Sequence, residues 1–201
     1  MNMQQLKANR FNRHRHSFPS TMVIEAMEQN LLAVKLALQN TTSVQNGSER
    51  AFGILGYPAA ILMFSIVDTI GSHFRKSKSQ PLMIVGNGSV KISCSGDQHF
   101  YILNSEYFNL ELKKDDIKAF YKIGRNALTH NSLIGEELTL AASHDTPFLE
   151  VCEASGKGKY VVHLHSFYEA CANAITLFKL NKDTIFENSI NAKMFPLTRG
   201  K

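Results

Sequence analysis

The sequence predicts a mainly α-helical protein, a bundle of four to five helices with a small peripheral β-hairpin. Apolar residues recur at helical spacing in several long stretches, whereas two short alternating runs are confined to 147–165. A hydrophobic content of 44% and a charged content of 19% are typical of a globular chain. Helices joined by short connections pack as a bundle, so this is the expected architecture.

The first two helices are expected over 20–40 and from Pro58 to about Lys76. The first can be capped by Ser20 or Thr21, and a polar loop over 41–50 with an Asn-Gly turn signal follows it. The second begins within the longest uncharged run, 51–67, which is shorter than the ~20 apolar residues that a membrane span needs. We therefore expect a buried central helix and no membrane segment.

The remaining elements are shorter. The β-type composition around a Gly-Asn-Gly sequence predicts a small hairpin or an irregular excursion over 82–93. A polar–apolar pattern predicts helices over 97–108 and 112–132. Two alternating runs around Gly156 to Gly158 predict the hairpin at 147–165. A last helix is expected over 166–181, capped by Ser166 with Glu169 three residues later.

The net charge of +5 is concentrated at the N-terminus. Before the first acid, Glu25, the basic residues are Lys7, Arg10, Arg13 and Arg15. We interpret 1–18 as a basic, disordered arm and 19–201 as a single domain that contains the hairpin. The arm is either a solvated tail or a segment in which Arg10, Arg13 and Arg15 contact nucleic-acid phosphates.

The three cysteines, Cys94, Cys152 and Cys171, are far apart and form no CxxC pair. This argues against a disulfide framework or a zinc knuckle and favours reduced thiols in a cytoplasmic protein. No metal or cofactor is expected.

A weaker alternative is a metal site at the second hairpin. His163 and His165 are two apart on a predicted strand and so would share one face, with His144 and Asp145 as further ligands. Surface residues on a strand are the other interpretation. No GxSxG sequence supports a hydrolase triad, and the SGKGK segment lacks the strand–loop–helix frame of a phosphate-binding loop.

The helix at 112–132 carries the most informative polar residues. At ~100° per residue, its apolar stripe faces the core and leaves Asn126 and His130 on another side. Arg125 lies at the edge of the stripe; the stripe is formed by Ile117, Phe120, Tyr121, Gly124 and Leu128. A second, narrower apolar strip of Ile123, Ala127 and Ile134 predicts contact with a partner subunit.

The segment FYKIGRNALTHN resembles the signature of the HEPN family, an Arg, usually followed by a polar residue, then His after four to six residues. Here Asn126 follows Arg125, and four residues separate Arg125 from His130. The resemblance covers this helix closely and the helical bundle loosely, and it extends to neither the basic arm nor the 147–165 hairpin. It implies a HEPN-like fold for this chain.

The resemblance also implies a function, that of a metal-independent endoribonuclease acting as a homodimer in a defence or stress context. In such a protein Arg125 would stabilise the phosphate, His130 would transfer protons and Asn126 would orient the imidazole or bind the phosphate. The expected partners are RNA, a second subunit through the Arg125–His130 helix, and an antitoxin or operon partner. The alternative is a noncatalytic RNA- or nucleotide-binding HEPN-like dimer or a regulatory partner.

Overall fold

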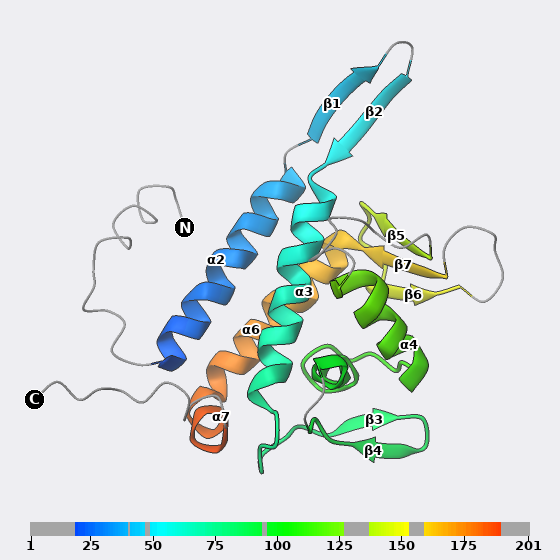
Figure 1. Cartoon of the computed structure of the whole chain (residues 1–201). Helices are drawn as coiled ribbons and strands as arrows, with labels where there is room; N and C mark the ends of the chain where they lie inside the picture. Colours follow the sequence, from blue (N-terminus) through cyan, green and yellow to red (C-terminus); the bar gives the residue numbers. More distant parts are fainter. Residues whose placement is uncertain are drawn as a thin grey trace, which may run out of the picture.

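The computed structural model describes residues 19–39, 41–46, 49–93, 96–126, 137–152 and 159–189 of the 201-residue chain, with the backbone alone at 19 and 41–54. The protein is mainly helical with small sheets, as predicted (Figure 1). The N-terminal arm with Arg10, Arg13 and Arg15 lies outside the described residues, and so does His130.

Three long helices form the centre of the fold: α2 (Pro19–Gln39), α3 (Gly56–His73) and α6 (Leu164–Leu180). They pack against one another, with the short α7 (Lys182–Asn188) beside the end of α6 (Figure 1). Helix α3 is the buried central helix that the sequence predicts, and it begins two residues before Pro58. Within the described part of the chain, no helix is long and apolar enough to cross a membrane.

The connection between α2 and α3 differs from the prediction. Instead of a polar loop, strands β1 (Thr41–Asn46) and β2 (Glu49–Ile54) pair antiparallel, with Asn46 opposite Glu49. The two strands therefore form a hairpin, a structure for which an Asn-Gly dipeptide is a favourable sequence signal.

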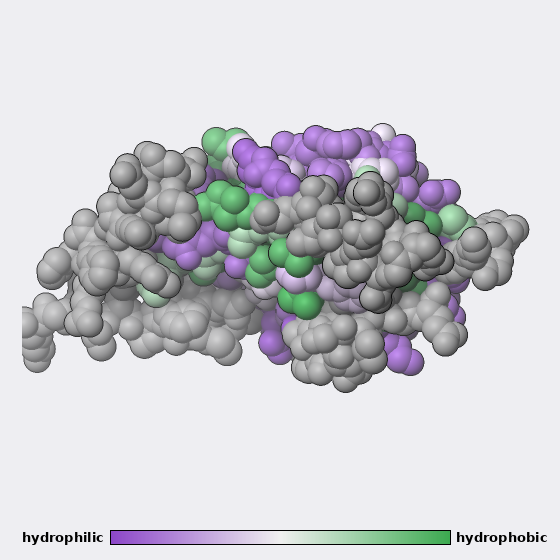
Figure 2. Space-filling model, turned by 90° about the horizontal axis from the view of Figure 1, so that it is seen from above, coloured by the Kyte–Doolittle hydropathy of each residue, from purple (hydrophilic) through white to green (hydrophobic). Residues whose placement is uncertain are grey.

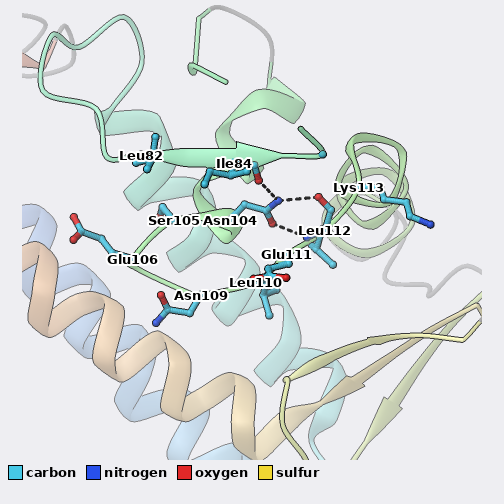
Figure 3. Close-up of a pocket in the computed structure, with 11 residues that line it drawn as sticks. Leu82, Ile84, Asn104, Ser105, Glu106, Asn109, Leu110, Glu111, Leu112 and Lys113 are labelled. Atoms are coloured by element: carbon cyan, nitrogen blue, oxygen red, sulfur yellow. Dashed lines mark hydrogen bonds between the residues drawn. The ribbon is translucent and has the colours of Figure 1, made fainter. Parts of the chain in front are cut away.

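A second hairpin confirms the prediction for 82–93. Strands β3 (Met83–Val85) and β4 (Gly88–Val90) pair antiparallel, and Gly86 takes a positive φ of 62° at the turn, which glycine adopts without strain. The following helix, η2 (Gly96–Asn104), is a 3₁₀-helix that ends earlier than the predicted 97–108. At its end the buried Asn104 amide donates to Ile84 O (2.7 Å) and to Leu112 O (2.8 Å) (Figure 3), bonds that fasten the turn to β3.

The predicted single helix at 112–132 is divided. The α-helix α4 (Lys114–Ala119) passes directly into a π-helical segment, η3 (Phe120–Asn126). Ile117, Phe120 and Gly124 are buried, which confirms this part of the predicted core stripe. Because a π-helix bonds i to i+5, residues after Phe120 do not follow the α-helical phase from which the position of Asn126 was predicted.

The hairpin at 147–165 is part of a larger sheet than expected. Strands β6 (Leu149–Val151) and β7 (Tyr160–His163) pair antiparallel as predicted, but β5 (Leu138–Ala141) adds parallel to the other edge of β7. The sheet is integral to the core rather than peripheral, because Tyr160 and Val162 are fully buried. Sequence periodicity missed β5, whose four residues are too few for a clear pattern.

The start of α6 corrects a second prediction. The helix begins at Leu164 with His163 at the N-cap position and has no side-chain cap. Ser166, the predicted cap, lies inside the first turn, and its buried Oγ has no hydrogen-bond partner among the described residues. The capping box with Glu169 is therefore wrong.

We expect His73, near the end of α3, to make the stability of the fold sensitive to acid. Its Nδ1–H donates to Thr69 O (2.8 Å), and its ring packs against Phe178 and Phe186. Burial lowers the pKa of His73, although the bond to Thr69 opposes this. The folded state thus binds fewer protons than the unfolded chain, and its free energy of unfolding falls as the pH drops below about 6.5.

We expect His73→Gln, which retains a donor, to remove part of this fall. Denaturant unfolding at pH 7.5 and 5.5 measures it as a smaller loss of stability in the variant than in the wild type. An equal or larger loss in the variant would show that His73 is not responsible.

Candidate functional site

Three segments bring a polar cluster to one side of α3. Asp68 of α3 accepts hydrogen bonds from Arg125 Nη2 at Oδ2 and from His99 Nδ1 at Oδ1, both at 3.1 Å. Arg125 Nη1 also donates to Asn126 Oδ1 at 3.1 Å. The guanidinium lies over the Tyr121 ring, 5.7 Å from its centroid, a distance suited to a cation–π contact. The Asp68 carboxylate therefore links η2 and η3 to α3 through these two hydrogen bonds.

Two glycines allow these segments to approach. A Cβ at Gly71 would lie 2.1 Å from the carbonyl oxygen of His99, so η2 packs directly against the backbone of α3. A Cβ at Gly124 would lie 2.7 Å from Phe64 Cζ, so η3 packs closely against a side chain of α3. Since real Cβ contacts are wider than these, glycine is required at both positions. The close packing places His99 and Arg125 within reach of Asp68.

The electrostatics of the cluster centre on the Asp68 carboxylate. Burial by itself would raise the pKa of Asp68, but the hydrogen bond from His99 and the positive charge of Arg125 outweigh it and leave the pKa below its ordinary value. Arg125 and Asp68 keep 26% and 24% of their side chains exposed, so the pair is open to solvent on one side. An arginine has more N–H groups than the bonds to Asp68 and Asn126 use, so Arg125 retains donors for an anion.

His99 has a different part in the cluster. Its Nδ1 contacts Asp68, and its Nε2 is buried with no hydrogen-bond partner among the described residues. Because Nδ1 contacts Asp68 and Nε2 is buried, His99 holds the Asp68 carboxylate in place instead of presenting a proton to a substrate.

The sequence-based candidates have mixed outcomes. Arg125 and Asn126 do lie together at the end of η3, bonded to each other. His130, the third member of the motif, is outside the described residues, as are Arg10, Arg13 and Arg15. Asp68 and His99 were missed. One signal was present: Asp68 is the first charge after a long apolar run, and a lone carboxylate on a buried helix needs a cationic partner.

The residues of the predicted metal site also come together, though not as ligands. His163 ends β7, but His165 belongs to α6, so the two do not share a strand face. The rings of His144 and His165 stack at 4.4 Å, and His163 Nδ1 lies 3.5 Å from Asp145 Oδ2. Across the described ranges, no group of three or more His, Cys, Asp or Glu side chains is arranged to hold a metal ion.

Two of the three cysteines lie within the described residues. Cys171 is fully buried and Cys152 is half-buried, and both are free thiols. Burial raises the pKa of the Cys171 thiol well above its ordinary value, so this thiol is unreactive.

A cavity of about 690 Å³ lies between β3 and the turn after η2 (Figure 3), and its lining residues do not include Asp68, His99 or Arg125. The exposed apolar side chains of Leu82 and Ile84 line one side, and Glu106 and Glu111 line the other. Seen from above, the described surface has separate hydrophobic spots among hydrophilic residues (Figure 2). The Asp68 cluster is a stronger candidate for a functional site than this cavity, because its charged side chains are held by tightly packed elements.

Comparison with known proteins returns no relative. No protein-family model, no curated protein and no solved structure matches the chain. A functional interpretation therefore depends on the geometry of the Asp68 cluster and on the motif that contains Arg125.

Proposed function

We propose that the protein is a HEPN-like, metal-independent endoribonuclease whose phosphate-binding group is Arg125. The proposal depends on one observation: the partly exposed guanidinium of Arg125 is held in a fixed position. Asp68 of α3 accepts a hydrogen bond from it, and the Tyr121 ring packs beneath it. A fixed arginine with remaining donors is suited to a phosphate, because its planar, permanently charged fork matches two phosphate oxygens.

The chemistry follows from the residue types. Cleavage of RNA without a metal starts when a base removes the proton of the ribose 2′-OH, and the transition state then gathers negative charge on the phosphate oxygens. In this proposal Arg125 stabilises that charge and His130 transfers the protons. The Oδ1 of Asn126 accepts from Arg125, and in this proposal its amide NH₂ donates to the phosphate or to His130.

The proposal includes a homodimer in which two copies of the η3 segment meet. Ile123, the described member of the predicted second apolar strip, is only half-buried, although it also packs against the core. Basic residues of the arm would add attraction to RNA. A defence or stress role, a cytoplasmic location and an antitoxin partner belong to the same proposal.

A second candidate is a noncatalytic RNA- or nucleotide-binding protein of the same fold. The Arg125–Asp68 ion pair favours it, since the carboxylate partly neutralises the guanidinium and so weakens the stabilisation of a transition state. Such a protein would bind RNA in a salt-sensitive way and leave it intact.

Incubation of the purified protein with a mixed RNA pool in EDTA separates the two candidates. We expect cleavage by the wild type and a loss of about 100-fold or more in Arg125→Ala and in His130→Ala. Arg75→Ala, which alters an arginine outside the cluster, and His144→Ala, which removes an exposed histidine, are the matched controls and should retain activity. RNA that the wild type binds but does not cut, with weaker binding by Arg125→Ala and His130→Ala, would establish the noncatalytic alternative.

A further inference from the structure

A second polar cluster, separate from Arg125, is built around His163 at the end of β7. The Nδ1 atom of His163 lies 2.6 Å from Ser143 Oγ, a short and strong hydrogen bond. On the other side of the ring, Nε2 lies 3.5 Å from Glu150 Oε2 of β6. A hydroxyl thus bonds one nitrogen of the imidazole and a carboxylate lies near the other, the residue types found in nucleophilic serine sites.

The backbone holds this arrangement in place. His163 N donates to Phe148 O (2.8 Å), and His165 N donates to Ser143 O (3.2 Å), so the serine loop is tied to the first turn of α6. The His163 side chain is only 8% exposed, whereas Ser143 is half-buried. A fixed, shielded imidazole therefore contacts a hydroxyl that solvent can still reach.

The surrounding charges favour proton transfer from Ser143 to His163. With Nε2 protonated toward Glu150, the free lone pair of Nδ1 accepts the serine O–H. When Nδ1 takes that proton, the resulting imidazolium has the Glu150 carboxylate at one nitrogen and the Asp145 carboxylate, 3.5 Å away, at the other. Both carboxylates stabilise the positive charge that forms as the serine becomes a nucleophile.

We propose that Ser143 is the nucleophile of an acyl-transfer site for small, uncharged carboxylic esters, with His163 as its base. Ser143 Oγ bonds to the ester carbonyl carbon while its proton passes to Nδ1; the ester C–O bond breaks and the leaving oxygen takes that proton. Water then bonds to the acyl carbon, the C–Oγ bond breaks, and the water proton returns through Nδ1 to Ser143, releasing a carboxylic acid.

The charge of the site defines the substrate class. Among the described residues, the charged side chains that face His163 from the neighbouring strand and loop are Asp145 and Glu150, and the nearby His144 lies 3.9 Å from Glu169. These negative charges repel phosphodiesters and other anions, so the site is not a second RNA site. An uncharged ester meets no such repulsion.

A tagged fluorophosphonate tests the proposal on the full chain. The Oγ–P bond forms and the P–F bond breaks, with fluoride leaving and the serine proton passing through Nδ1 to solvent. We expect mass spectrometry to find the adduct on Ser143, and its rate to fall roughly 10-fold in Glu150→Gln. Glu150 is 56% exposed, so this variant folds even if changes at the buried His163 do not.

Matched variants determine the result. Ser143→Ala should remove labelling, while Ser79→Ala, which alters a serine whose hydroxyl and backbone N–H both bond to Ser77 Oγ, should leave the rate unchanged. Absence of an adduct on the folded wild type would overturn the proposal. So would an adduct on another residue, or a Ser143 adduct whose rate is the same in Glu150→Gln.

Discussion

Replacement of Asp68 with alanine should lower RNA cleavage by about 100-fold and destabilise the protein by about 1–3 kcal/mol. Asp68 bonds both Arg125 and His99, so its removal frees the guanidinium and leaves the His99 ring without its carboxylate. A displacement of only ~1 Å in a phosphate-binding group can cost this much activity. Single-turnover cleavage and denaturant unfolding measure the two effects.

Two further variants separate position from charge. Asp68→Asn keeps an oxygen for Arg125 but not the charge, and its activity should be intermediate. Glu28→Ala removes the exposed bond to Lys179 (2.9 Å), and its stability should change by less than about 0.5 kcal/mol. Cleavage by Asp68→Ala at the wild-type rate would mean that Arg125 does not need Asp68.

Replacement of Gly71 with alanine should destabilise the fold by about 3 kcal/mol, the largest effect expected from the addition of one methyl group. The new Cβ would lie 2.1 Å from the carbonyl oxygen of His99, and this oxygen belongs to the backbone, so no side-chain rotation relieves the clash. Helix η2 would have to move away from α3 and would carry His99 away from Asp68. RNA cleavage should fall together with stability.

Gly88 provides the matched control. A Cβ at Gly88 would meet nothing within 4 Å, so Gly88→Ala should change the free energy of unfolding by less than about 0.5 kcal/mol. Equal stability of the two variants in urea unfolding would contradict the close approach of α3 and η2.

Long, strongly periodic elements could be predicted from the sequence. In α2, in the buried α3 and in α6, apolar residues recur at helical spacing over a stretch long enough that single exceptions do not obscure the pattern. Short elements could not: β5 has four residues, and the Asn-Gly signal before β2 fits a loop as well as a hairpin. The π-helical segment η3 was also missed, because its i to i+5 bonding depends on tertiary packing that leaves no periodic signal.

The candidate site shows the same division. Arg125 and Asn126 could be selected because they are adjacent in a motif. Asp68 and His99 are 57 and 26 residues from Arg125 in the chain, and the close packing at Gly71 and Gly124 brings the three together. Ser143 and His163 likewise meet through strand pairing and not through spacing. A single sequence carries little information on such contacts between distant segments.

The most direct measurement for the central claim is cleavage, in EDTA, of one short RNA and of its all-2′-deoxy counterpart by the wild type and by Arg125→Ala. If Arg125 stabilises a reaction that starts at the ribose 2′-OH, the wild type cuts only the RNA and Arg125→Ala cuts it about 100-fold more slowly. Equal rates for the two proteins, or equal cleavage of the deoxy strand, would contradict it.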